Sequence, residues 1–117
     1  MTGGDQERNL AVVSAWIEAY NAQDFPALAG LVGKSFRVDD PATGNHIEGW
    51  DAFEETARQV ARTYPDRRIT VLQMLPLGDS AVALQGEWDS AAAGAHHIES
   101  MVVELVDGKI ASRRIYR

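Results

Sequence analysis

The segment SFRVDDPATG places two acidic side chains at the end of an alternating apolar pattern. Residues i and i+2 of a strand share a face, so Phe36, Val38 and Asp40 would lie on the same side. The two apolar side chains must turn toward the core. We therefore expect Asp40 at the rim or floor of an apolar cavity, and Asp39 in solvent near Arg37.

A carboxylate in that position has an obvious chemical use. Burial raises the pKa of a carboxyl group, and a raised pKa suits proton transfer at neutral pH. This chemistry makes Asp40 a candidate general acid or base. The alternative is local, because an Asx-type turn that Pro41 stiffens would also explain an acid at the end of a strand.

A second pair of ionisable side chains occurs in HHIESMVVEL. If Glu104 faces solvent, strand alternation turns His97, Glu99 and Met101 inward. His97 and Glu99 would then share a face two residues apart, as an acid–base pair or an orienting pair. A structural pair at the open edge of the sheet is the alternative.

The histidines form no recognised metal motif. His96 and His97 are adjacent and would point to opposite faces of a strand, and His46 lies in a distant segment. The chain contains no cysteine, glycine-rich phosphate loop, GxSxG elbow or Ser–His pairing. We therefore expect no metal site and no cofactor.

Composition and charge limit the kinds of molecule that the protein is expected to bind. The chain has 117 residues, of which 45% are hydrophobic and 24% are charged, as in an ordinary folded domain. Its formal net charge of −6 argues against a surface that follows nucleic-acid phosphates. It has neither an apolar run of the ~20 residues that span a bilayer nor a signal-peptide pattern at MTGGDQERNL. These features predict a cytoplasmic protein that binds neither nucleic acid nor membrane.

Two helices are predicted in the N-terminal third of the chain. Apolar residues at helical spacing indicate a helix over residues 6–22, with Asp5 as its N-cap. Asp24 would cap a short second helix that carries Pro26 in its first turn. Gly33 is expected to end this second helix.

A strand at KSFRVDD and a loop at PATGNHIEG are expected next. Asp51 and Glu54 resemble a capping box and predict the start of a third helix, which Pro65 ends.

The second half of the chain reads as a meander of four strands. These are RRITVLQML, SAVALQGEWD, HHIESMVVELV and KIASRRIYR, and Asp107-Gly108 is a hairpin signal before the last of them. Helices gathered in one part of the chain and an antiparallel sheet in the other indicate the α+β class. We interpret residues 1–117 as a single domain.

Four segments carry a resemblance to a known family: VVSAWIEAYNAQDFPALAGLV, FRVDDP, GWDAF and DGKIASRRIY. Together they resemble the nuclear-transport-factor-2-like superfamily over about residues 8–116. Within it, the chain is similar to the SnoaL-like polyketide cyclases and the ketosteroid isomerases. The resemblance implies a cone-shaped α+β fold, with three N-terminal helices packed on a strongly curved, mostly antiparallel sheet. It also implies a pocket between helices and sheet, and a homodimer.

The resemblance implies roles for individual residues. In the ketosteroid isomerases an Asp before a proline at the end of the first strand is the general base, and DDP puts Asp40 there. The family positions that donate hydrogen bonds to the substrate oxygen, a Tyr and a protonated Asp, hold Trp16 and Met101 here. The family's strand parity puts Arg113 on the inner face, where it would neutralise Glu99 or hold a substrate carboxylate or enolate. A structural ion pair is the alternative for that arginine.

These inferences together predict a small-molecule isomerase or cyclase of the SnoaL-like kind, acting on an apolar substrate that contains a carbonyl group. The alternative is a binding protein that holds an apolar ligand or a protein partner without turnover. The predicted catalytic residues are Asp40, His97 and Glu99. The predicted substrate-binding residues are Trp16, Tyr20, Trp88, Met101 and Arg113.

Overall fold

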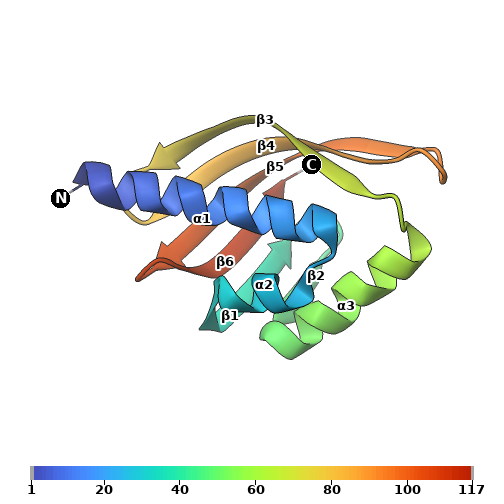
Figure 1. Cartoon of the computed structure of the whole chain (residues 1–117), viewed down its shortest axis with the longest axis horizontal. Coiled ribbons are helices and arrows are strands. Elements are labelled where there is room, and N and C mark those ends of the chain that lie inside the picture. The colour runs from blue at the N-terminus through green and yellow to red at the C-terminus, as the bar shows by residue number, and fades with distance from the viewer. Residues whose placement is uncertain (1, 117) are drawn as a thin grey trace.

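The computed structural model describes the backbone of residues 2–116 and the side chains of residues 5–116. All three helices begin in the first half of the chain, and four of the six strands follow the last helix (Figure 1). In chain order the elements are α1 (Thr2–Ala22), α2 (Phe25–Gly30), β1 (Val32–Asp40), β2 (Asn45–Glu48), α3 (Trp50–Thr63), β3 (Arg68–Leu77), β4 (Ala81–Ser90), β5 (Ala95–Val106) and β6 (Lys109–Tyr116). This arrangement confirms the α+β class. Among the described helices, none combines the length and apolarity needed to cross a lipid bilayer.

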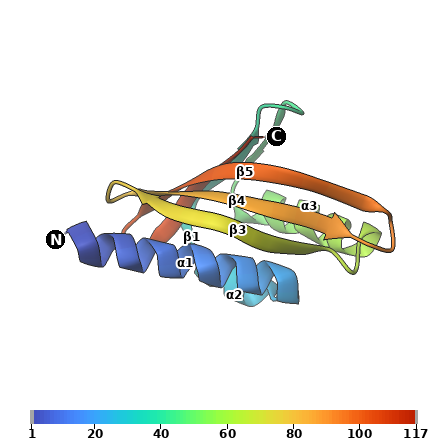
Figure 2. The ribbon, with the colours of Figure 1, turned by 90° about the horizontal axis from the view of Figure 1, so that it is seen from above.

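The six strands form one sheet in the order β2-β1-β6-β5-β4-β3. Every neighbouring pair is antiparallel except β1 and β6, which run parallel and bring the first and last strands together. The sheet is curved and does not close, with β1 and β2 turned away from the long β3–β4–β5 ribbon (Figure 2). Strand alternation behaves as expected in β4, where every second residue is buried from Val82 to Ser90.

Helix α1 lies along the inner face of the sheet and contacts β3, β4 and β6 (Figures 1 and 2). Two asparagines attach it to the edge of the sheet. The Asn21 side chain accepts from the Ile69 N–H at 2.8 Å and donates to the Ile69 carbonyl at 2.9 Å. The Asn9 side chain donates to the Asp79 carbonyl at 2.8 Å. The Asn21 bonds cover part of the exposed edge of β3, which would otherwise present unpaired backbone groups, and the Asn9 bond holds the β3–β4 turn.

The sequence signals at the ends of α1 and α2 were partly right. Asp24 caps α2, and its carboxylate accepts from the Ala27 N–H at 3.2 Å, as predicted. The N-cap expected at Asp5 is wrong, because α1 already begins at Thr2 and Asp5 lies in its first turn. Gly33 does not end α2 either, since the helix ends at Gly30 and Gly33 belongs to β1.

Two expectations about the chain after β1 are wrong. The segment expected to be a loop contains β2, which pairs with β1 through Asp40 and Asn45, and through Val38 and Ile47. The N-terminus of α3 has Gly49 as its cap, with no side-chain hydrogen bond, in place of the expected capping box. Helix α3 ends before Pro65, as expected, and packs against β1 and β2.

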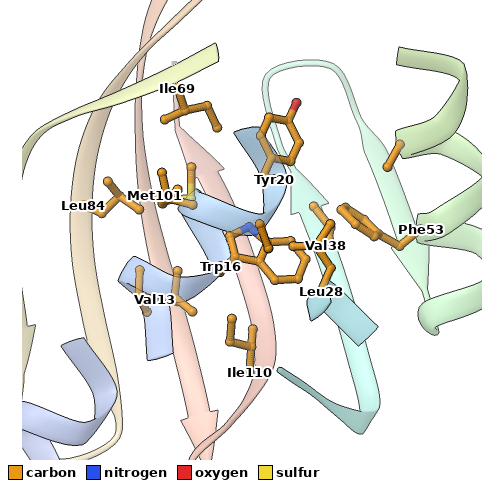
Figure 3. Close-up of a cluster of buried hydrophobic side chains, with 14 of the residues drawn as sticks. Val13, Trp16, Tyr20, Leu28, Val38, Phe53, Ile69, Leu84, Met101 and Ile110 are labelled. Carbon is orange, nitrogen blue, oxygen red and sulfur yellow. The ribbon is translucent and has the colours of Figure 1, made fainter. Parts of the chain in front are cut away.

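The core is built around three aromatic rings from three elements. Trp16 of α1, Phe36 of β1 and Phe53 of α3 are each no more than 6% exposed. Their ring centroids are 5.3–5.8 Å apart, within the range of favourable aromatic packing. Figure 3 shows Trp16 at the centre of the buried cluster, with Leu28 of α2 beside it. This packing places α3 against β1, beside the space described next.

Candidate functional site

A cavity of about 400 Å³ lies between α3 and the inner face of the sheet. Its walls contain residues of α1, of α3 and of all six strands. Most of these side chains are apolar, and the ionisable residues Asp40, His97, Glu99 and Arg113 are among them. The cavity therefore has the composition typical of small-molecule sites, with an apolar wall and a few convergent polar groups.

Asp40 lies on the cavity wall and is 6% exposed. The predicted parity is confirmed, because Phe36 and Val38 are also buried on this face. The main-chain carbonyl of Asp40 closes the following turn by accepting from the N–H groups of Thr43 at 3.2 Å and Gly44 at 2.9 Å. Asp40 thus closes the turn through its main-chain carbonyl and also directs its carboxylate inward.

Asp39 lies on the opposite face of β1, where it is partly exposed near Arg37, as expected. It forms a close contact with Nδ1 of His46, whose Nε2 lies 2.9 Å from Glu48. The hydrogen bond with His46 lowers the pKa of Asp39, and desolvation opposes this effect. The two carboxylates, Glu48 first and Asp39 second, raise the pKa of His46. The group is a surface cluster that joins β1 to β2.

His97 and Glu99 form the predicted inward pair on β5. Nε2 of His97 lies 3.0 Å from Oε2 of Glu99, and Glu99 is only 5% exposed. The His97 ring stacks on Trp88 of β4, with centroids 5.1 Å apart and an angle of 12° between the rings. This stacking and the bond to Glu99 fix the orientation of the imidazole, and both residues line the cavity.

Arg113 of β6 is 5% exposed and lines the same cavity. Its guanidinium carbon lies over the rings of Trp16 at 5.1 Å and Phe53 at 5.9 Å, and its Nη2 is 3.7 Å from Met101 Sδ. Burial lowers the pKa of Arg113, and the nearby Tyr20 and Glu99 partly offset that effect. The inner-face position expected for Arg113 is confirmed.

The predicted aromatic contacts divide into two groups. Tyr20 and Trp88 line the cavity, and the Trp88 indole N–H donates to the Tyr20 hydroxyl at 3.3 Å. Trp16 and Met101 are each 1% exposed and lie outside the described lining. Both residues belong to the buried core cluster, and their contact with a substrate stays a prediction. Trp16 is one helical turn before Tyr20, in the centre of the core cluster (Figure 3).

Sequence reasoning missed a set of lining residues from β2 and α3. Asn45 and Ile47 of β2 belong to the cavity wall, as do Thr56, Val60 and Tyr64 on the α3 side. No sequence signal singles these residues out, since the spacing of apolar residues does not distinguish a packed side chain from one that borders an empty volume. Among residues 2–116, no group of three His, Asp or Glu side chains is arranged to hold a metal ion.

The SnoaL-like domain family model matches residues 13–113. The chain belongs to the SnoaL-like domain family. No curated protein sequence matches this SnoaL-like chain.

Solved structures share the fold at low sequence identity. A candidate ketosteroid isomerase from Kribbella flavida has a TM-score of 0.85 and 22% identity over 98% of this chain and 79% of that protein. A candidate polyketide cyclase from Sinorhizobium meliloti has a TM-score of 0.80 and 17% identity over 91% and 94% of the two chains. A protein from Catenulispora acidiphila with a ketosteroid isomerase-like fold, solved with trimethylamine, has a TM-score of 0.76 and 16% identity over 91% and 84%. These likenesses establish the fold that the SnoaL-like chain shares with them.

Proposed function

We propose that the protein is a small-molecule isomerase or cyclase in which Asp40 is the general acid and base. The observation that carries this proposal is the position of Asp40, a 6% exposed carboxylate on the wall of an apolar cavity of about 400 Å³. Carboxylates in such surroundings are suited to moving protons to and from carbon. Membership of the SnoaL-like family supports the same reaction class.

The proposed reaction begins when the Asp40 carboxylate removes a proton from a carbon next to a carbonyl group. The electron pair of the C–H bond moves to the carbonyl oxygen and forms an enolate. In an isomerisation, protonated Asp40 returns the proton to a different carbon of the conjugated system. In a ring closure, the enolate carbon attacks a second carbonyl group of the same molecule, and the alkoxide that forms takes up the proton.

The other ionisable residues of the cavity have supporting roles in this proposal. Arg113 supplies positive charge to a developing oxygen anion, which the low dielectric of the buried site strengthens. Glu99 orients His97 through the 3.0 Å contact, so that the imidazole can exchange a proton with the substrate. Trp88, which stacks on His97, offers an apolar surface to a flat ring.

Deuterium exchange tests the proposal without knowledge of the natural substrate. Small bicyclic ketones such as 2-tetralone fit the size class of the cavity and carry exchangeable protons next to a carbonyl group. The protein is incubated with each ketone in deuterium oxide, and loss of the proton signal is followed by nuclear magnetic resonance. We expect exchange well above the buffer rate for at least one ketone.

A second candidate function is a binding protein that uses the cavity without turnover. The observation in its favour is that Trp16 and Met101, which hold the family's donor positions, lie outside the cavity lining. Ketones that bind with a measurable affinity and exchange at the buffer rate would support binding alone. Such a result would remove the isomerase or cyclase proposal.

We also propose that the protein forms a homodimer through the outer face of the sheet. A groove of about 160 Å³ on that face is lined in part by Leu75, Ala83, Val102 and Tyr116. Leu75 and Tyr116 are 45% and 46% exposed, and Ile98 nearby on β5 is 48% exposed. Apolar side chains gathered on one sheet face are typical of a surface that another chain covers.

A further inference from the structure

Arg113 has few polar partners for a buried charge. Its Nη2 contacts the weak acceptor Met101 Sδ at 3.7 Å, its guanidinium lies over two aromatic rings, and its Nε has no hydrogen-bond partner among the described residues. None of the ion pairs formed within residues 2–116 includes Arg113. A guanidinium has five N–H donors, so Arg113, which lines the cavity, keeps donors that no described residue fills, and Glu99 is the nearby carboxylate that acts on its charge.

Tyr20 offers a second donor beside this charge. The Trp88 N–H occupies one lone pair of the Tyr20 hydroxyl at 3.3 Å, which leaves the hydroxyl proton for donation. Figure 3 shows the Tyr20 ring extending from α1 with its hydroxyl at the end farthest from Trp16. Tyr20 and Arg113 both line the cavity, so their free donors share the same space.

We propose that Tyr20 and Arg113 form an anion subsite inside the cavity, and that the natural ligand is an apolar carboxylic acid whose carboxylate binds there. A carboxylate can accept two parallel hydrogen bonds from a guanidinium, which matches the unused donors of Arg113. The Tyr20 hydroxyl would bind one of the same two oxygens. The apolar wall around the subsite would hold the rest of the molecule.

The register of the sheet relates this subsite to the proposed base. Arg113 pairs with Val38 in the parallel β1–β6 ladder, and Asp40 is the next inward residue on β1. A carboxylate bound at Arg113 would therefore place neighbouring carbons of the ligand on the side toward Asp40. This inference rests on the cavity being the ligand site of the proposed function, but it does not require turnover.

The test compares two ligands of nearly equal shape, naphthalene-2-carboxylate and the neutral naphthalene-2-carboxamide. Calorimetry at neutral pH measures the affinity of each for the full chain. We expect the wild type to prefer the carboxylate by about tenfold or more, the range of a hydrogen bond to a charged group. Arg113→Met should abolish that preference, Arg113→Lys should restore part of it, and Tyr20→Phe should reduce it several-fold.

Two variants control for charge and for the loss of a hydroxyl. Arg114→Met removes the neighbouring arginine, which lies on the opposite face of β6 near Asp39, and Tyr116→Phe changes an exposed tyrosine. Both should keep the preference of the wild type.

Three results would overturn the anion subsite: equal affinity of the wild type for both ligands, no binding of either ligand, or an unchanged preference in Arg113→Met. Equal losses in Arg113→Met and Arg114→Met would also overturn it, since only net charge would then matter. If Arg113→Met does not fold, Tyr20→Phe against Tyr116→Phe decides the question. A failed exchange assay leaves this proposal standing, because binding is measured without chemistry.

Discussion

Asp39 and Asp40 are adjacent carboxylates that the pleat of β1 sends to opposite faces of the sheet. Asp40 meets the apolar cavity, whereas Asp39 meets His46, Arg37 and Arg114 at the surface. The hydrogen bond with His46 lowers the pKa of Asp39 and favours its charged form. Because Asp39 and Asp40 have the same side chain in different environments, Asp39 can serve as a control for Asp40.

His97 provides a residue-scale prediction. His97→Phe keeps a flat ring beside Trp88 but removes the 3.0 Å contact with Glu99. We expect the exchange rate to fall about tenfold, the scale of one hydrogen bond to a charged group, while 2-tetralone binding stays within a few-fold. His96→Phe is the control, because His96 points outward near Glu87. Equal effects of the two variants would contradict the assigned role of His97.

Strand parity predicted much of the site at this scale. The period of two in β1 and β5 directs Asp40, His97 and Glu99 to the inner face, and this follows from sequence alone. The burial of Trp16 and Met101 outside the cavity lining does not follow from parity. Whether an inward side chain borders the cavity or lies beneath its floor depends on how α1 and the sheet pack together.

Strand β2 depends on its contact with β1, and the His46 cluster predicts how pH affects that contact. Glu48 and Asp39 raise the pKa of His46, so its contribution to stability is complete below the unfolded pKa of 6.5. The contribution is lost as pH rises through the higher folded value. The pKa of Asp39 is lowered, so its contribution is complete above 3.8 and is lost as pH falls through the lower folded value.

His46→Gln tests this assignment. The unfolding midpoints of the wild type and the variant are measured at pH 5.5 and at pH 8.5. We expect the wild type to be more stable than the variant at pH 5.5, and the difference to shrink at pH 8.5. A difference that grows with pH would show that protonated His46 does not stabilise the attachment of β2.

Gly86 of β4 lies so close to β3 that we expect a larger side chain there to lower stability. An added Cβ would lie 3.0 Å from Ile69 Cγ2 and 3.4 Å from the Thr70 carbonyl oxygen. We expect Gly86→Ala to lower the free energy of unfolding by about 1–3 kcal/mol, as overpacking does. Gly30→Ala is the control, because nothing lies within 4 Å of its added Cβ. Urea denaturation that finds Gly86→Ala as stable as Gly30→Ala would contradict this packing.

Local sequence signals located most helices and strands. The errors fall on segments whose secondary structure depends on tertiary contacts. The turn residues Asp107 and Gly108 have φ values of 51° and 76°, as the hairpin signal predicted. Strand β2 was missed because Pro41 and Gly44 made its surroundings look like a loop, and four residues are too few for a clear period. Only its pairing with β1 makes this segment a strand.

At the scale of the whole molecule, the outer face of the sheet predicts the oligomeric state. We expect a mass of twice 12.8 kDa in solution, measured by light scattering. Leu75→Glu with Ile98→Glu should give monomers, because a charge opposite apolar side chains is costly to bury. Ala52→Glu, at an exposed position on α3 away from that face, should remain dimeric. A wild-type monomer would contradict the proposed interface.

The sequence predicted the overall fold better than it predicted the cavity. The order of helices and strands indicated the α+β class, and the resemblance to the SnoaL-like family is confirmed by the family match over residues 13–113. The cavity required coordinates, since it lies where α3 meets the sheet. Phe53 packs against Trp16 and Phe36 at this junction, and spacing along the chain does not predict that contact.

The central claim is that Asp40 moves a proton within the cavity, and one pair of variants tests it most directly. Deuterium exchange into 2-tetralone is measured with Asp40→Asn and with Asp39→Asn, alongside the affinity of each for the ketone. The account predicts that Asp40→Asn loses about a hundredfold or more in rate, the usual contribution of a general base, and keeps its affinity within a few-fold. It predicts that Asp39→Asn exchanges at the rate of the wild type. Exchange that survives in Asp40→Asn would contradict the account.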